Sequence, residues 1–298
     1  MDSAPRRRPF DTQDIERVLS FCADHPVSDL PRTLRRRFLT TLTSSAEGVV
    51  ELTANDGAVV IAVVIDEIES DADCAVMELL AVREGPSLPA LLATALDAAE
   101  PFVRGGARSG IEAPVQPDQT AWGALLQSRS YHHAFTSYDM ATAAREPPPM
   151  PPLPGPEWRW ERAHVGHAIP YYASVQAAMA GIPGFYPSSF EKFRERLGQP
   201  GGLEAVLLCG ARVAGFACGV IKQADFGYIS LIGRHPRFRG QGLGEVLLAY
   251  TMGALAELGA VRYGLDVTAS NAGAIDLYQR HGFEVEQSVP VYRALLSD

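Results

Sequence analysis

The 298-residue sequence predicts an α/β protein in which one fold occurs twice in tandem, each copy a mixed, mostly antiparallel sheet flanked by helices. Three observations lead to this prediction. The length is about twice that of a usual domain. Seven prolines lie between Glu146 and Pro156 and favour an extended linker at the middle of the chain. The same order of helix and strand signals recurs on both sides of it. The predicted domains are residues 1–145 and 157–298, joined by residues 146–156.

The C-terminal half carries the clearer secondary-structure pattern. Alternating apolar residues on both sides of Gly210-Ala211-Arg212 predict a hairpin, and Gly282 ends the last helix. A loop rich in glycine and proline separates the first two helices. Strands are expected at 158–162, 205–209, 213–222, 228–234, 263–268, 283–286 and 289–295, and helices at 167–179, 190–197, 243–258 and 272–281.

The N-terminal half repeats this order with weaker signals. Internal duplication of one fold explains the repetition most economically. Helices are expected at 11–24, 34–43, 90–99 and 119–128, and strands at 49–53, 59–67 and 76–82.

Composition and charge restrict the function. The net charge of −9 lies entirely in residues 1–150, and this acidic half argues against non-specific binding to nucleic acid. The longest aliphatic run, residues 59–65, is too short to cross a membrane. Four cysteines without CxxC spacing, and a start without an apolar signal segment, favour a cytoplasmic protein.

A glycine-rich turn is the sharpest functional signal. It runs from a predicted strand through Arg239-Gly-Gln-Gly-Leu-Gly244 into a predicted helix. Glycines allow close approach of a ligand, and amides at a helix N-terminus suit a pyrophosphate. The turn lacks the Gly-Lys-Ser/Thr of a P-loop and the spacing of a dinucleotide fingerprint. A plain strand-to-helix turn is the alternative interpretation.

The landmarks that follow this turn extend the pattern. Together with Asn271, Ala274, Leu277-Tyr278 and Gly282-Phe283, the turn resembles the GNAT superfamily of acyl-CoA-dependent N-acyltransferases. The segment from Leu265 to Asn271 is most similar to the ribosomal-protein alanine N-acetyltransferases. The resemblance is tight over residues 228–283 and covers the rest of 157–298 by element order.

The resemblance implies acetyl-CoA as co-substrate, no metal, and a role for each matching residue. Tyr278 is expected to act as general acid at the thioester sulfur and Asp266 as general base, while Phe185 and Tyr186 are expected to line the acceptor site. Gly233-Arg234 departs from the small-apolar and valine pair usual in the family. The residues expected to bind the cofactor are Ile232, Gly233, Arg234, Arg239, Gly240, Gln241, Gly242, Leu243, Gly244, Glu245 and Asn271.

These assignments have structural alternatives. Asp266 is equally well explained as an ordinary carboxylate at a strand end, and Tyr278 as a core tyrosine of an amphipathic helix. An ordinary phenol is a weaker acid than a thiol, so hydrogen-bond donation to the sulfur is the safer role for Tyr278. Glu161, His164 and His167 have a spacing compatible with a metal, but they straddle a strand end and a helix start, and no metal is expected.

The function expected from this pattern is transfer of an acetyl group to a primary amine by direct attack in a ternary complex. The acceptor is a small molecule or a peptide, with no nucleic acid or membrane partner. A non-catalytic acyl-CoA-binding protein is the alternative, and Tyr278 separates the two because a pure binder does not need it. Monomer and homodimer both remain open.

The N-terminal copy is expected to have the fold without the reaction. Aligning the halves leaves its turn four residues short where the glycines belong, with Glu84, Pro86 and Pro89 in what remains. Proline lacks an amide hydrogen and a carboxylate repels phosphate. The alignment also places Leu126 opposite Tyr278 and Gln119 opposite Asn271. A divergent copy that binds a different acyl donor is the alternative.

Overall fold

The computed structural model describes residues 6–8, 46–53, 57–65, 74–83, 85–104, 110–143, 146–185, 188–198, 202–222 and 225–295. Its contacts divide the chain into two compact units. Unit 1 comprises Met1–Thr136 with Ser288–Asp298, and unit 2 comprises Ser137–Gln287. The helices expected at 11–24 and 34–43, and Tyr186, lie outside the described residues.

Unit 1 contains a mixed sheet and two described helices, which share one apolar core. The strand order is β1-β2-β3-β4-β5-β12, with β4 and β5 parallel and the other paired strands antiparallel. The helices bury leucines and alanines against the sheet, together with Trp122. The elements are β1 (Arg6–Arg8), β2 (Ala46–Thr53), β3 (Val59–Ile65), β4 (Cys74–Arg83), α3 (Leu88–Arg104), β5 (Gly110–Pro114) and α4 (Thr120–Ser128).

Strand β12 (Glu284–Leu295) closes the sheet of unit 1 by pairing with β5. Arg293 lies opposite Glu112, whose side chain is buried, and its Nε donates to the Glu112 carboxylate at 2.8 Å. The two strands expected at 283–286 and 289–295 are therefore one. The polar residues Gln287 and Ser288, between the two expected strands, lie where the strand passes from unit 2 to unit 1.

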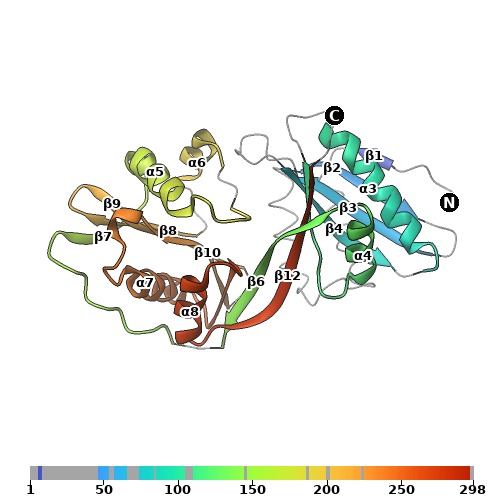
Figure 1. Ribbon diagram of the computed structural model, residues 1–298. Helices are drawn as coiled ribbons and strands as arrows, with labels where there is room; N and C mark the ends of the chain where they lie inside the picture. Colours follow the sequence, from blue (N-terminus) through green and yellow to red (C-terminus); the bar gives the residue numbers. More distant parts are fainter. Residues whose placement is uncertain are drawn as a thin grey trace. The chain divides into compact units, whose positions relative to one another are not determined.

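Unit 2 is also a mixed sheet, with strand order β6-β11-β10-β9-β8-β7. Helices α5 and α6 cover one face and α7 and α8 the other (Figure 1). The mixed sheet flanked by helices is thus confirmed for this unit. Its elements are β6 (His132–Thr142), β7 (Trp158–Arg162), η1 (Val165–His167), α5 (Ala168–Met179), α6 (Phe190–Arg196), β8 (Leu203–Cys209), β9 (Arg212–Ile221), β10 (Phe226–Arg234), η2 (Pro236–Phe238), α7 (Leu243–Glu257), β11 (Arg262–Thr268) and α8 (Ala272–Arg280).

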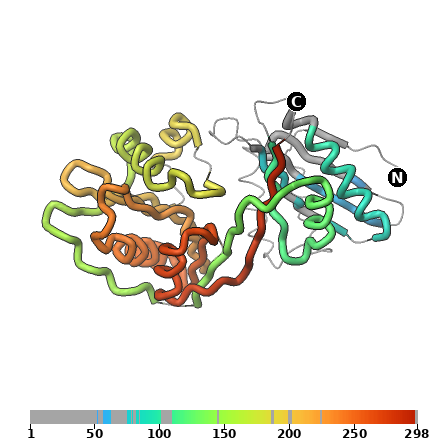
Figure 2. Tube along the Cα trace, viewed as in Figure 1, coloured from blue at the N-terminus to red at the C-terminus, as the bar shows by residue number. Residues whose placement is uncertain are grey.

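Strand β6 brings sequence from before the proline-rich segment into the sheet of unit 2. It pairs antiparallel with β11 over six residues, from Ser137 opposite Thr268 to Thr142 opposite Tyr263. Figure 2 traces the chain into unit 2 through β6, in green, and out again through β12, in red. The division by contacts therefore differs from the predicted boundaries, because strand pairing over long sequence distances leaves no mark in the order of elements.

The proline-rich segment connects two strands of unit 2. Residues 146–157 form neither helix nor strand, as the prolines predict, and they lead from β6 to β7, at opposite ends of the strand order in this unit. Leu153 packs against a buried cluster that includes Trp158 and Leu247. Within the described ranges, no helix is long and apolar enough to span a membrane.

Helices α4 and α8 are similar in local structure. Each has nine residues, with Gln119 or Asn271 at the N-cap. Leu126 and Tyr278 both occupy the seventh helical position, and each carbonyl accepts the amide five residues further on, at 3.0 and 3.1 Å. The turn between β4 and α3 spans residues 84–87, whereas that between β10 and α7 spans 235–242. The four-residue deficit expected in the N-terminal copy is present.

Candidate active site

The turn between β10 and α7 presents an open helix N-terminus. Gly240 and Gly242 have left-handed backbones, with φ of 77° and 69°. No described atom lies within 4 Å of where a β-carbon would stand at either position. Gly242 is the N-cap of α7 and supplies no capping side chain, so the first amides of this 15-residue helix lack a side-chain acceptor. Such amides at the positive end of a helix fit a phosphate.

The turn is fixed by contacts on both sides. The His235 ring accepts the Arg237 amide at 3.2 Å, and Phe238 packs edge-on against Trp158, with the ring centres 5.5 Å apart. Beyond the turn, Leu243 is buried. The glycine turn is therefore held between a short 3-10 helix and the core, which is the rigidity that anion binding by backbone amides requires.

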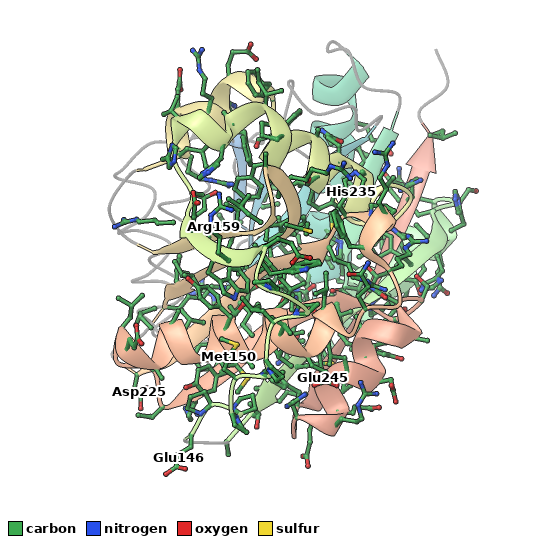
Figure 3. The ribbon with its side chains drawn as sticks, turned by 90° about the vertical axis from the view of Figure 1, so that its left-hand side faces the viewer. Glu146, Met150, Arg159, Asp225, His235 and Glu245 are labelled. Atoms are coloured by element: carbon green, nitrogen blue, oxygen red, sulfur yellow. The ribbon has the colours of Figure 1, made fainter. Side chains whose placement is uncertain are left out.

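Glu245, in the first turn of α7, carries a charge that would oppose an anion. Figure 3 labels it together with His235. Its carboxylate accepts bonds from Arg280, at 2.9 Å, and from His281, both at the end of α8. Partial burial works against ionisation, but the bonds from His281 and Arg280 prevail and lower the pKa of Glu245. The negative charge of the Glu245 side chain is thus balanced by residues at the end of α8. Glu245 can therefore contribute to an anion site only through its backbone amide.

The long polar side chains predicted at this site are on the surface. Arg234, Arg239 and Gln241 are exposed. The Arg239 guanidinium has no ion-pair partner among the residues that the structure describes. A cation beside the glycine turn is therefore free to meet an anionic ligand.

Strands β10 and β11 separate next to this turn. Their parallel pairing runs from Phe226–Arg262 to Ile229–Leu265 and stops there. Beyond that point β10 pairs with β9, after a bulge between Ile229 and Leu231, while β11 pairs with β6. The two inner edges are left without each other's hydrogen bonds, so an extended ligand arm could pair with them like an added strand.

The predicted pantetheine residues Ile232, Gly233 and Arg234 lie on the β10 side of this opening. Position 233 is restricted to glycine, because a β-carbon there would overlap the buried Phe216 ring. The departure from the family pattern at Gly233 therefore has a local packing reason.

Asp266 is the first β11 residue beyond the last pair with β10, and it belongs to a cluster of ionisable side chains. Its cross-strand partner on β6 is Asp139. The Tyr228 hydroxyl, from β10, donates to Asp266 Oδ2. The Lys222 ammonium, which follows β9, lies 2.9 Å from the centre of the Tyr228 ring. Four strands thus bring two carboxyl groups, a phenol and an amine together at the opening.

The pKa values of three groups in this cluster are shifted from their ordinary values. Burial, then the charge of Asp266 and a hydrogen bond with it, raises the pKa of Asp139 to about 7. Burial lowers the pKa of Lys222, although Asp266 and Asp139 oppose this, and burial raises the pKa of Tyr228 well above its ordinary value. Perturbed groups gathered in one place indicate a functional site.

Only Asp266 of this cluster was predicted from the sequence. Asp139 carried a faint signal, as a carboxylate inside an otherwise half-apolar strand, and Lys222 is one of only two lysines in the chain. Their meeting depends on the β6–β11 register, which local patterns do not encode.

Tyr278 lies near the end of α8, in the core of unit 2. It is 7% exposed and packs against Phe283, with ring centres 5.8 Å apart. Burial raises its pKa to about 12. Within the described part of the chain, its hydroxyl has no hydrogen-bond partner. Asn271 begins the same helix, and its side-chain oxygen accepts the Ala274 amide at 3.4 Å, so its cap role uses the oxygen and leaves its NH₂ available.

The loop between α5 and α6 is held to the end of β11. The Thr268 hydroxyl donates to the Pro183 carbonyl at 2.8 Å, two residues beyond Asp266. Phe185 is half-buried against the core under α5 and α6. The predicted acceptor loop is thus anchored beside the ionisable cluster through Pro183.

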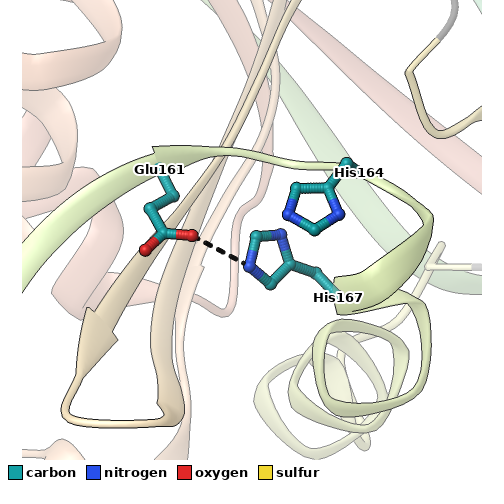
Figure 4. Close-up of side chains that lie close together, drawn as sticks. All are labelled: Glu161, His164 and His167. Carbon is teal, nitrogen blue, oxygen red and sulfur yellow. Dashed lines mark ion pairs between the residues drawn. The ribbon is translucent and has the colours of Figure 1, made fainter.

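Glu161, His164 and His167 do come together, as Figure 4 shows. Their potential ligand atoms lie within 4.8 Å of one another. His167 Nε2 is 3.1 Å from a Glu161 oxygen, and Arg159 donates to the other oxygen at 2.6 Å. His164 Nδ1 accepts the Gly166 amide at 3.0 Å and so caps η1. A cation at this cluster would have to compete with Arg159 for Glu161 and with the Gly166 amide for His164 Nδ1.

Comparison with protein families gives one match, which covers part of the chain. Residues 170–283 match the acetyltransferase (GNAT) family. The matched GNAT segment begins in α5 and ends at Phe283, so it contains the opening, the glycine turn and Tyr278. Comparison with curated proteins gave no significant match.

Solved structures resemble the whole chain. A GCN5-related N-acetyltransferase from Sphaerobacter thermophilus superposes with a TM-score of 0.71 at 19% identity, covering 99% of this chain and 96% of that one. A tandem GNAT protein from the clavulanic acid biosynthesis pathway gives 0.65 at 13% identity, covering 99% of both. A putative acetyltransferase from Pyrococcus horikoshii gives 0.60 at 14% identity, covering 100% and 92%. At such identities the likeness shows a shared fold.

Proposed function

We propose that unit 2 transfers an acetyl group from acetyl-CoA to a primary amine of a small molecule or peptide, by direct attack in a ternary complex. The observation that carries the proposal is the opening between β10 and β11 beside a glycine turn at a helix N-terminus. An extended arm and a terminal pyrophosphate fit these two features at once. The family match over the same residues supports it.

The geometry supports a cofactor role for each part of this site. Backbone groups of residues 232–234 meet the pantetheine arm at the unpaired edge of β10. Amides of residues 240–245 and the Arg239 cation hold the pyrophosphate, and Asn271 contributes its free NH₂. No metal is needed for this chemistry. The open space at Gly240 and Gly242 is the observation that fits a phosphate.

The reaction needs a proton acceptor and a group that stabilises the departing thiolate. An alkylammonium with pKa of about 10 must lose its proton before attack, and Asp266 at the opening is placed to accept it. Tyr278 is the group proposed to stabilise the departing thiolate. With its pKa raised to about 12 against about 8.5 for a thiol, full proton transfer to the sulfur would be uphill by about 5 kcal/mol. Tyr278 therefore acts by donating a hydrogen bond to the developing negative charge.

Unit 1 is proposed to carry the fold without the reaction. Leu126 occupies the helical position of Tyr278, and the short turn before α3 leaves no room for a glycine cradle. The full chain is then expected to bind one acetyl-CoA.

The test is titration of the full chain with acetyl-CoA by calorimetry, followed by thiol release with a panel of amines. One site per chain and amine-dependent thiol release are expected. Binding without release from any amine would favour the alternative, a non-catalytic acyl-CoA-binding protein. Absence of binding would refute both, and two sites would refute the assignment of unit 1. The resemblance to ribosomal-protein alanine acetyltransferases makes an alanine-terminated peptide one member of the panel.

A further inference from the structure

We propose that Asp139, on β6, rather than Asp266 itself, is the residue that takes the proton from the acceptor amine, with Asp266 as its partner. This inference rests on the proposed acetyl transfer and names a second carboxyl group for it. Asp139 precedes the proline-rich segment in the sequence, outside the residues that match the GNAT family. It therefore belongs to no motif of the resemblance.

The position of Asp139 follows from strand register. It lies directly opposite Asp266, which is the first residue of β11 after the pairing with β10 ends. Residues opposite each other in an antiparallel pair have β-carbons about 5 Å apart on the same face. Both carboxyl groups thus stand on one face of the sheet, where β10 and β11 begin to separate and where the thioester end of an inserted arm would lie.

The other face of these strands is apolar. Met140 and Leu265, adjacent to the two aspartates, are buried in the core with α7 and α8. Alternation along the strands therefore directs Asp139 and Asp266 to the opposite face, the one covered by α5 and α6. The acceptor loop between those helices is bound to Thr268 on the same strand.

The surrounding charges distinguish the two carboxyl groups. The Tyr228 hydroxyl of β10 donates to Asp266, so an oxygen of that carboxyl group already accepts a hydrogen bond. The Lys222 ammonium beyond β9 attracts both, and Glu286 on β12 adds negative charge near Asp139. The hydrogen bond between the two carboxyl groups requires one proton, and these neighbours leave it on Asp139.

A carboxyl group with this proton affinity suits an amine better than an ordinary aspartate does. Proton transfer from an alkylammonium to a carboxylate of ordinary pKa is unfavourable by about 10⁶-fold. The pKa of about 7 at Asp139 reduces this to about 10³-fold. The Asp139 carboxylate takes one proton from the ammonium, and the neutral amine nitrogen forms the C–N bond. The C–S bond then breaks, and the second proton of the attacking nitrogen passes to the departing thiolate, which leaves an amide and a free thiol. The proton on Asp139 then passes to solvent before the next turnover.

The test compares pH profiles of kcat/KM for the full chain and three variants, with the amine that gives the highest thiol release. Asp139→Asn is expected to lower kcat/KM at least tenfold and to move the acidic limb, near pH 7 in the parent chain, down by at least one pH unit. Asp266→Asn is expected to retain more activity, with a limb also at lower pH because Asp139 loses its negative neighbour. Asp225→Asn is the control, since this exposed carboxylate precedes β10 at its other end, and its profile should not change.

Carboxyl ¹³C NMR titration of the full chain without substrate provides a second readout. One resonance titrating near pH 7, absent in Asp139→Asn, is expected. Its absence from the parent chain would overturn the proposal even if the enzyme is active. The proposal would also be overturned if Asp139→Asn kept the rate and the pH profile of the parent chain while Asp266→Asn lost its activity. The proton would then be assigned to Asp266. Lack of thiol release by the parent chain with every amine, despite a carboxyl titrating near pH 7, would instead refute the acetyltransferase function on which the role rests.

Discussion

Replacing Gly242 by valine tests the anion site at the start of α7. The glycine has φ of 69°, and a left-handed backbone costs a residue with a β-carbon roughly 1–2 kcal/mol. The β-carbon itself would meet no described atom, so the added side chain projects into the space assigned to the pyrophosphate. The variant should therefore remain folded, lose about 1–2 kcal/mol of stability, and bind acetyl-CoA at least tenfold more weakly, or by about 1.4 kcal/mol.

Two further variants separate backbone strain from obstruction of the site. Gly253→Val places the same side chain in the middle of α7, where a β-carbon also meets open space but φ is not left-handed. It should leave acetyl-CoA affinity unchanged. Gly242→Asn tolerates the left-handed backbone and still adds a side chain at the turn.

The measurements are isothermal calorimetry with acetyl-CoA and urea unfolding monitored by circular dichroism. Gly242→Asn should keep most of the stability and lose most of the affinity that Gly242→Val loses. Folded Gly242 variants that bind acetyl-CoA like the parent chain would refute the reasoning, because the phosphates would then bind elsewhere.

Three further outcomes are expected. Tyr278→Phe should lower kcat at least tenfold, or about 1.4 kcal/mol, while calorimetry still shows one acetyl-CoA site; an unchanged kcat would remove the hydroxyl from the mechanism. Arg293→Met should destabilise the chain in urea by on the order of 3 kcal/mol, because the Glu112 carboxylate is buried; a loss below about 1 kcal/mol would mean that its other contacts suffice to neutralise it. The folded chain holds the Asp139 proton more tightly than the unfolded chain does, so the free energy of unfolding should fall as the pH rises from the ordinary carboxyl pKa of 3.8 to about 7, by at most about 1.4 kcal/mol per pKa unit. Asp139→Asn should flatten that dependence in urea titrations at pH 5 and pH 7.5, and an equally steep fall in the variant would place the proton on another group.

Local signals in the sequence were sufficient for most of unit 2. The hairpin at Gly210, the glycine turn and the helix that follows it were predicted to within a few residues, because periodicity and turn chemistry act over short distances. The mixed sheet flanked by helices followed from their order.

Two kinds of feature were not predictable in this way. Strand β5 contains a buried carboxylate, Glu112, that makes the segment look polar. Its hydrogen-bond donor Arg293 lies 181 residues further along the chain. The pairing of β6 with β11 is equally non-local, and it decides which carboxyl group faces Asp266. The candidate base predicted from the sequence was therefore half of a pair.

Strands β6 and β12 link residues that lie far apart in the sequence. Strand β6 covers the edge of β11, adds Met140 to the core under α7 and α8, and supplies Asp139 at the opening. Residues 291–295 of β12 pair with β5 in unit 1, and Tyr292 packs against the apolar core of that unit. An exposed strand edge and a buried carboxylate without its cation are both costly. The pairing of β6 with β11 and that of β12 with β5 each cover a strand edge, and β12 also supplies Arg293 as the cation for Glu112.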